Sequence, residues 1–282
     1  MRVGFVTCVQ LGLSCMEAIY DVGGKLVFAG SLLDSQATNK SGRVFLDEFC
    51  ARREIPLAKF RNINDPDAIA SIRAAELDWL MIIGWSQIAR DEVLASARCG
   101  VLGMHPSLLP IGRGRAAVPW AILLNLPETG VSLFQLDGGV DTGPVVAQLR
   151  LPLSCREDAT SLYERVNAAH RALIKEAWKD LQAGELALQP QDSRQATVWE
   201  GRTPEQGRLS PSMSVEHADR LIRAVTRPYP GAFIDVGGRR LRIWKAEPGD
   251  LEIPPGAGPE TALVFGDGWL RILDFVWETP VP

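Results

Sequence analysis

The chain has 282 residues, of which 46% are hydrophobic and 23% are charged. These are ordinary globular values that exclude a disordered or collagen-like chain, and the length allows one large domain or two smaller ones. Lys and Arg number 30 against 34 Asp and Glu, so the net charge is -4. That charge argues against a nucleic-acid binder that depends on a strongly basic surface, although local charge leaves anionic ligands open.

Strands and helices alternate over the first two thirds of the chain. Strands are expected over residues 2–7, 25–33, 78–84, 100–105, 129–137 and 144–153. Helices are expected over residues 11–20, 44–55, 67–76, 116–125 and 156–184. Such alternation predicts an α/β fold with a Rossmann-like, mostly parallel sheet flanked by helices.

The pattern changes after residue 185. Residues 186–211 are polar, and we interpret them as a linker. A helix over 214–227 then precedes a hairpin over 231–247 with Gly237-Gly238 at its turn, and further strands follow. The predicted domains are therefore a catalytic domain over 1–185, the linker, and a small β-rich, OB-like domain over 212–282.

The composition also bears on the compartment. No run of 18 apolar residues occurs, so no transmembrane helix is expected. The start of the chain is interpreted as a buried first strand rather than a signal peptide. Five scattered cysteines without a C-x-x-C pair indicate reduced thiols in a cytoplasmic protein. Cys/His metal spacing is absent, so no metal is expected.

The densest cluster of special residues is GMHPSLLPIGRGRAAVPW, residues 103–120. It carries His105 at the end of an expected strand, where α/β sheets bind ligands. A second cluster, LDGGVDTGP, carries Asp137 and Asp141. A carboxylate can orient an imidazole that moves a proton. A structural histidine and ordinary turn aspartates are the alternatives, because both are common in such loops.

Several well-known motifs are missing. The phosphate-loop pattern G-x-x-x-x-G-K-[ST] and the dinucleotide pattern G-x-G-x-x-G do not occur, which leaves a nicotinamide-dependent enzyme without support. G-x-S-x-G is also absent, which argues against an α/β-hydrolase.

Three segments of the chain resemble the folate-dependent formyltransferase family. HPSLLPIGRGRAAVPWAI followed by TGVSLFQLDGGVDTGPVVAQ is similar to the family pattern N-x-H-x-S-L-L-P-x-x-R-G with an Asp-Thr-Gly turn some 35 residues later. QATVWEGRTPEQGRLSP resembles the family's linker. LIRAVTRPYPGAFIDVGGRRLRIWKAE resembles the C-terminal domain of methionyl-tRNA and sugar-nucleotide formyltransferases.

The resemblance implies transfer of a formyl group from N10-formyltetrahydrofolate, as co-substrate, to an amine. The same resemblance implies that His105 transfers the proton and that Asp141 adjusts the properties of that histidine or of the water beside it. The implied folate pocket comprises Gln87, Ile88, Ala89, Arg115, Asp137, Gly138, Gly139, Val140 and Asp141. Ser107 would shape the substrate loop. Independently of the resemblance, the loop of Arg113 and Arg115 could clamp a pyrophosphate, since guanidinium pairs bidentately with phosphate; the alternative for Arg113 is a salt bridge that closes the loop.

One position departs from the family. Gly103 stands where the family has Asn, whose amide donates to the developing oxyanion, and losing such a donor typically costs about 10²–10³ in rate. Three explanations stay open: another donor replaces the Asn, the reaction uses a different one-carbon unit or donor, or catalysis is weak or absent.

The acceptor is expected to be a nucleotide-linked amino sugar, with the net charge placing it ahead of initiator tRNA. A local cluster of basic residues in the C-terminal part keeps a methionyl-tRNA formyltransferase-like function open: Arg220, Arg223, Arg227, Arg239, Arg240, Arg242 and Lys245. A specialised-metabolite amine as acceptor stays open as well, and so does a folate-binding protein with weakened catalysis. No nucleic acid or membrane partner is expected, and a homodimer stays open.

Overall fold

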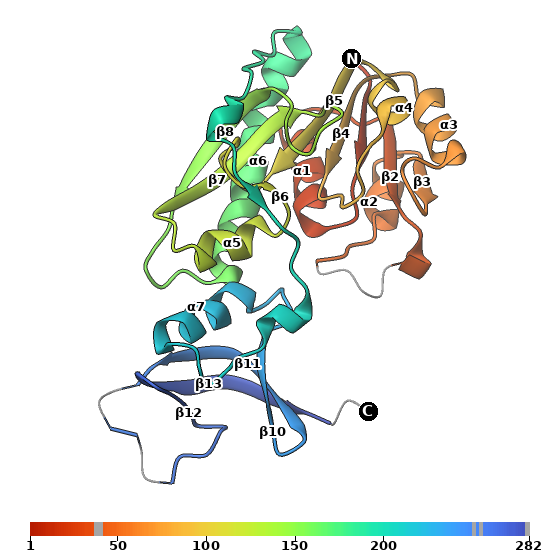
Figure 1. The fold of residues 1–282 in the computed structure, drawn as a ribbon. Coiled ribbons are helices and arrows are strands. Elements are labelled where there is room, and N and C mark those ends of the chain that lie inside the picture. Colours follow the sequence, from red (N-terminus) through yellow and green to blue (C-terminus); the bar gives the residue numbers. More distant parts are fainter. Residues whose placement is uncertain (37–41, 250–251, 254–255, 280–282) are drawn as a thin grey trace. The chain divides into compact units, whose positions relative to one another are not determined.

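The computed structural model describes residues 1–36, 42–249, 252–253 and 256–279. It consists of two compact units (Figure 1). Unit 1 comprises Met1–Gly114, Thr129–Leu151 and Arg165–Trp199. Unit 2 comprises Arg115–Glu128, Pro152–Glu164 and Glu200–Pro282.

A central sheet forms the core of unit 1. Within the described residues its strands run in the order β3-β2-β1-β4-β5-β7-β8. Their bounds are Val3–Val6 (β1), Phe28–Leu32 (β2), Leu57–Phe60 (β3), Leu77–Ile83 (β4), Ala97–His105 (β5), Glu128–Gln135 (β7) and Val145–Pro152 (β8). Strands β1 to β5 pair in parallel, whereas β7 pairs antiparallel with β5. Every residue of β1 is buried, as expected for a strand covered on both faces.

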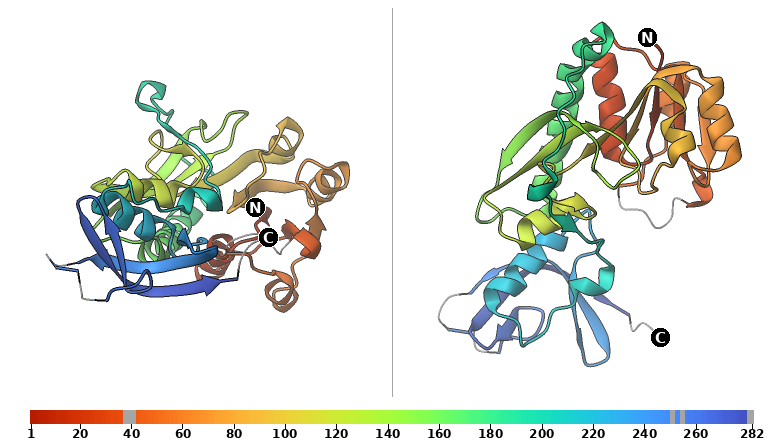
Figure 2. Two further views of the ribbon diagram at one scale, coloured as in Figure 1. Left: turned by 60° about the horizontal axis from the view of Figure 1, so that its bottom comes forward. Right: turned by 45° about the horizontal axis from the view of Figure 1, so that its top comes forward.

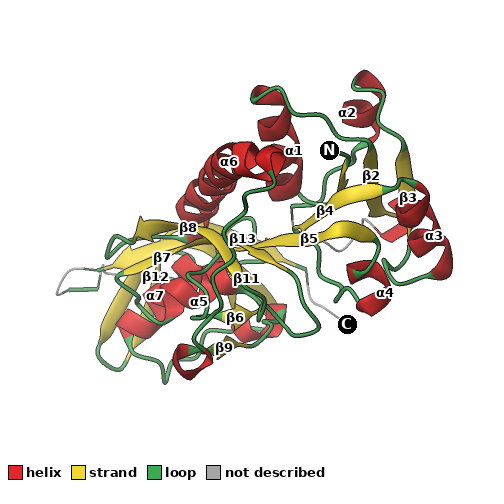
Figure 3. Cartoon of the chain, turned by 90° about the horizontal axis from the view of Figure 1, so that it is seen from above, coloured by secondary structure: helices red, strands yellow, loops and turns green. Residues whose placement is uncertain are grey.

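Helices cover both faces of this sheet. Their bounds are Gln10–Asp21 (α1), Asp47–Arg52 (α2), Pro66–Ala74 (α3), Asp91–Leu94 (α4) and Ala159–Ala183 (α6). Helices α1 and α6 lie side by side on one face, with α3 and α4 on the other (Figures 2 and 3). Arg171 of α6 joins the two neighbours through ion pairs to Glu17 and Asp21 of α1. The expected α/β class is confirmed.

Unit 2 is built on an antiparallel sheet of strand order β10-β11-β13-β12. The bounds of its elements are Ala117–Leu123 (α5), Val215–Val225 (α7), Ala232–Val236 (β10), Arg239–Pro248 (β11), Ala262–Phe265 (β12) and Gly268–Glu278 (β13). Helix α7 packs its apolar side, including the buried Leu221 and Ile222, on β11. Gly237 and Gly238 both have positive φ at the hairpin turn, which the tight two-residue connection requires.

The unit boundaries differ from the sequence-based ones. Residues 115–128 and 152–164 pack in unit 2, although they lie inside the predicted catalytic domain. The boundary between the two units falls inside the expected linker, between Trp199 and Glu200, so the first half of that segment belongs to unit 1 and the second half to unit 2. There β9 (Val198–Trp199) lies parallel to β6 (Arg113–Gly114). Residues 250–251, 254–255 and 280–282 of the predicted C-terminal domain lie outside the described residues.

The short elements β3 and α4, like the two-residue strands β6 and β9, have no counterpart among the predicted ones. The sequence of β3 is LAKF, in which Lys59 interrupts the apolar run, and α4 has only four residues. Within the part of the chain that the structure describes, no helix has the length and apolarity to cross a bilayer.

Candidate active site

His105 is the last residue of β5, and its side chain is buried in unit 1. Only 7% of the residue is exposed. Its Nε2 lies 2.7 Å from the carbonyl oxygen of Gly112. A carbonyl oxygen only accepts hydrogen bonds, so Nε2 carries a hydrogen and donates it. This fixes the ring orientation and leaves Nδ1 for chemistry.

Asp141 faces that second nitrogen. Its Oδ2 lies 3.5 Å from Nδ1 of His105 and accepts a hydrogen bond of 2.8 Å from the backbone N–H of Gly114. The residue has φ +53°, a left-handed conformation that aspartate tolerates better than most side chains. Such conformations cluster at functional sites, where neighbouring contacts hold them.

The pair is arranged to hold a proton. A neutral His105 turns the lone pair of Nδ1 toward a carboxylate, and neither group can donate to the other. A proton at Nδ1 satisfies both groups and produces an imidazolium beside an anion. This arrangement can pass a proton between Nδ1 and a bound molecule.

Two glycines shape the loop whose carbonyl oxygen accepts the hydrogen bond from Nε2 of His105. Gly112 has φ +72°, and a Cβ there would lie 2.3 Å from the ring of Trp199. Gly114 has φ +106°, and a Cβ there would lie 2.4 Å from the Trp199 carbonyl oxygen. Thr197 Oγ1 also accepts from the Gly112 N–H at 2.8 Å. Sequence reasoning missed Thr197 and Trp199, although the glycines of I-G-R-G-R were a signal of close backbone approach.

Arg113 is buried inside the loop. It is 7% exposed, and its Nε and Nη2 donate to Oε1 of Gln191 at 3.1 and 2.8 Å. Gln191 in turn donates to the carbonyl oxygens of Asp141 and Gly143 at 2.9 and 2.6 Å. Arg113 therefore has the loop-closing position that was the alternative to a pyrophosphate clamp. It holds the loop through a neutral amide rather than through a salt bridge.

Ser107 is also committed to internal contacts. The residue is 1% exposed, and its hydroxyl donates to the Ile111 carbonyl oxygen at 2.7 Å. Its own carbonyl oxygen accepts from the Ser132 hydroxyl at 2.7 Å. These contacts shape the loop, as expected for Ser107, but they leave its hydroxyl no exposed face for a substrate.

Comparison with models of protein families identifies the family of this chain. The formyl transferase family model matches residues 36–177, which is half of the chain. A second model, for the formyl transferase C-terminal domain, matches residues 202–277. The chain belongs to the formyl transferase family.

Solved structures of this fold include proteins of different function. HypX from Aquifex aeolicus in complex with tetrahydrofolic acid is 21% identical with a TM-score of 0.68, over 98% of this chain and 44% of that one. Methionyl-tRNA formyltransferase from Clostridium thermocellum is 20% identical with a TM-score of 0.61, over 89% and 95%. An N-formyltransferase from Helicobacter canadensis, in complex with folinic acid and dTDP-3-aminofucose, is 15% identical with a TM-score of 0.66, over 98% and 100%. This chain thus spans less than half of the HypX chain.

Two further loops with predicted site residues are fixed by side-chain hydrogen bonds. Oε1 of Gln87 accepts a hydrogen bond from the Ile63 N–H, and its Nε2 donates to the Arg61 carbonyl oxygen, both at 2.9 Å. In the second loop, Asp137 Oδ1 accepts from the Gly139 N–H at 3.1 Å and from the Thr142 hydroxyl at 2.6 Å. Each loop thus keeps its conformation through its own side chains.

These two loops adjoin and expose apolar groups. A Cβ at Gly138 would lie 4.0 Å from Oδ1 of Asp91, which follows the first loop. Ile88 is 63% exposed and Val140 is 47% exposed, while Ala89 is buried. Arg115, the remaining predicted pocket residue, is exposed and belongs to unit 2.

Gly103 has no room for a side chain as the loop stands. A Cβ there would lie 2.6 Å from Cδ2 of Leu136 and 3.4 Å from Cε1 of Phe134. Leu136 therefore occupies the space into which an asparagine at 103 would begin to extend.

A second histidine lies behind the site on α6. His170 is 1% exposed, and its Nδ1 donates to the Val166 carbonyl oxygen at 2.8 Å. Burial, together with the nearby His105, lowers the pKa of His170 to about 4, although the bond to Val166 opposes the shift. His170 is therefore neutral at pH 7 and adds no charge beside His105.

Proposed function

We propose that this chain transfers a formyl group from N10-formyltetrahydrofolate to an amine, with His105 as the proton-transferring residue. The observation that carries the proposal is the His105–Asp141 pair, in which Nε2 is fixed by Gly112 and Nδ1 faces a carboxylate 3.5 Å away. Membership of the formyl transferase family supplies the reaction class.

The reaction needs a group that both takes and returns a proton. The folate co-substrate supplies an activated formyl carbon. His105 accepts at Nδ1 the proton that the attacking amine loses, and Asp141 stabilises the resulting imidazolium. His105 then returns this proton to the departing nitrogen. The hydrogen bond from Gly114 keeps the Asp141 carboxylate in place through both steps.

The two adjoining loops suit a pterin ring. A flat heterocycle needs apolar contact and a few fixed polar groups. Ile88 and Val140 offer exposed apolar side chains, and internal hydrogen bonds pre-organise both loops. The folate of the HypX and Helicobacter canadensis structures supports the same assignment.

The charges of unit 2 support a small acceptor rather than tRNA. Most of the basic residues in the C-terminal cluster are ion-paired within the unit, as Arg220–Glu216, Arg223–Asp219, Arg227–Asp274, Arg240–Asp235 and Arg242–Glu278. Nucleic-acid binding depends on cationic side chains that neutralise phosphates and so release the counterions condensed on the nucleic acid. Arginines already neutralised by carboxylates provide less of this attraction, so the proposed acceptor is a nucleotide-linked amino sugar.

The thiols support a reducing, cytoplasmic location. All five cysteines lie within the described residues and are free, three of them buried and two exposed. Exposed free thiols are typical of proteins kept in reducing compartments.

The test is formyl transfer by the full chain. N10-formyltetrahydrofolate is supplied with dTDP- and UDP-linked amino sugars or with methionyl initiator tRNA, and the formylated product is measured by mass spectrometry. We expect product with a nucleotide-linked sugar and a loss of about 10²–10⁴-fold in His105→Ala. Formylation of tRNA alone would refute the acceptor class. Folate binding without turnover on any amine, with no effect of His105→Ala, would refute the enzyme assignment.

A further inference from the structure

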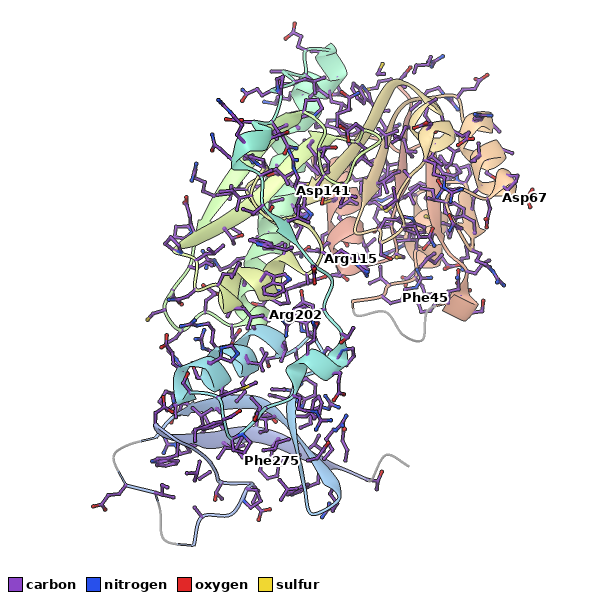
Figure 4. The ribbon with its side chains drawn as sticks, in the orientation of Figure 1. Phe45, Asp67, Arg115, Asp141, Arg202 and Phe275 are labelled. Atoms are coloured by element: carbon purple, nitrogen blue, oxygen red, sulfur yellow. The ribbon has the colours of Figure 1, made fainter. Side chains whose placement is uncertain are left out.

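Two arginines of unit 2 lie on adjoining segments without a carboxylate partner among the described residues. They are Arg115, which precedes α5, and Arg202, which follows β9; Figure 4 labels both. In the same unit Arg208, only six positions later, is paired with Glu205 and Asp235. The missing carboxylate partners therefore do not reflect a shortage of acids in this part of the unit.

A tryptophan and a glycine hold the two segments together. The Trp120 indole N–H donates to the Glu200 carbonyl oxygen at 2.8 Å. The guanidinium carbon of Arg202 lies 5.2 Å from the centre of the Trp120 ring. A Cβ at Gly201 would lie 3.3 Å from Nη1 of Arg115, so the glycine lets that guanidinium lie against the backbone next to Arg202.

Arg202 is only partly satisfied by the protein. Its Nη2 donates to the Gln206 carbonyl oxygen at 2.9 Å, but its Nε is buried and has no partner. Burial lowers the pKa of this guanidinium, which shows that its charge is incompletely solvated. Buried polar groups without a partner are uncommon and call for an explanation, such as a ligand that supplies the missing acceptor.

The arginine pair is tied to the histidine loop by chain connectivity. Gly114 donates its N–H to Asp141, and Arg115 is the next residue. The Gly112 carbonyl oxygen accepts a hydrogen bond from Nε2 of His105. Arg115 is three residues further along the chain, so its backbone lies within about 11 Å of Gly112 even at full extension. The covalent chain alone therefore keeps the Arg115 backbone near the loop that contacts His105.

We propose that Arg202, together with Arg115, forms an oxyanion subsite for the diphosphate of the acceptor substrate. The inference rests on the proposed function and assigns a residue to its substrate specificity. Arg113 is not available for this role, because Gln191 satisfies its guanidinium inside the loop. Two guanidinium groups on separate segments suit a diphosphate, which offers several acceptor oxygens on two phosphorus atoms.

A carboxylate of the folate tail is the competing oxyanion, because the family resemblance places Arg115 at the folate. If Arg202 binds the diphosphate, replacing it weakens nucleotide binding. If Arg202 binds the folate carboxylate, replacing it weakens folate binding. Isothermal titration calorimetry of the full chain at low ionic strength measures dTDP, UDP, inorganic pyrophosphate and 5-formyltetrahydrofolate separately. The variants are Arg202→Gln, Arg202→Lys and the matched control Arg208→Gln, each checked for folding by thermal unfolding.

We expect Arg202→Gln to weaken dTDP or UDP binding by about 10- to 100-fold, as the loss of charged hydrogen bonds implies. Arg202→Lys should give a smaller loss, whereas Arg208→Gln should bind like the unmodified chain. In both Arg202 variants, binding of 5-formyltetrahydrofolate should be unchanged. If Arg202→Gln fails to fold, the Arg202→Lys comparison decides.

Three results would overturn the inference. They are a loss confined to 5-formyltetrahydrofolate, no change of any binding constant in the Arg202 variants, and no binding of any diphosphate by the unmodified chain. The formyl-transfer assay stands apart from these measurements. A chain that binds diphosphates through Arg202 but formylates no amine would refute the proposed function and leave the subsite intact.

Discussion

Replacing Asp141 by Asn tests whether the carboxylate, rather than its shape, supports proton transfer. The amide oxygen can still accept the N–H of Gly114, which now binds Oδ2 at 2.8 Å. The same Oδ2 lies 3.5 Å from Nδ1 of His105, so in the variant a neutral amide oxygen faces Nδ1 in place of a carboxylate oxygen. The histidine keeps its hydrogen bond to Gly112 and its position, but it loses the negative charge that stabilises an imidazolium.

The expected magnitudes differ for rate and for stability. General acid–base catalysis contributes about 10²–10⁴-fold, so kcat should fall by that factor in Asp141→Asn. The hydrogen bond to Gly114 survives, so the free energy of unfolding should change by less than about 1 kcal/mol. Asp141→Ala removes the acceptor as well and should cost about 1–3 kcal/mol, because a partly buried backbone N–H loses its partner.

The assay compares the formyl-transfer kinetics of Asp141→Asn with those of the unmodified chain. Urea unfolding of both chains checks that the variant keeps its stability. A variant that folds normally and keeps its rate within about tenfold of the unmodified chain would refute the reasoning.

Three more predictions concern the surroundings of the pair. Gly103→Asn should cost about 1–3 kcal/mol of unfolding free energy by overpacking, and the same change in a Leu136→Ala background should cost less; additive losses in urea unfolding would contradict the clash. Gln191→Leu leaves a buried guanidinium without its acceptor, so chemical denaturation should show a loss of about 1.5–3 kcal/mol. Burial lowers the pKa of His170 to about 4, below the unfolded value near 6.5. The unfolded chain therefore binds this proton first, and stability should fall by up to about 3 kcal/mol as the pH drops from 6.5 to 4. His170→Gln should remove most of that slope. The control variant His217→Gln should keep it, because His217 is exposed.

The fold could be predicted well because its strands carry unusually clear signals. DWLMIIG becomes β4 with nearly every residue buried, and the Gly237-Gly238 turn connects β10 and β11. The unit boundaries could not be predicted, because they depend on contacts between distant segments. No local pattern in 115–128 indicates that it packs with α7, whose sequence begins about ninety positions later.

The candidate site was predictable in its centre and less so around it. His105 and Asp141 were expected to come from the ends of two strands, and they do lie 3.5 Å apart. The direction of β7 was missed. Because β7 runs antiparallel to β5, the loop after it begins beside Leu102 and must fold back to bring Asp141 to the histidine.

The supporting residues were hidden for a physical reason. Gln191 and Thr197 lie in a polar stretch that has the composition of a linker. Their side-chain hydrogen bonds to the loop leave no periodic pattern in the sequence. Composition reports whether a segment can bury apolar surface, but it does not report whether its polar groups find partners.

Gly103 gains a different meaning from its neighbour Leu136. Had the asparagine simply been lost, a cavity or a solvent-filled gap would be expected where its side chain began. A Cβ at 103 instead meets Cδ2 of Leu136 at 2.6 Å, so the space is already filled by an apolar side chain. The wall beside His105 is thus packed for a glycine. In the proposed reaction, the negative charge on the formyl oxygen therefore needs a donor other than an amide at position 103.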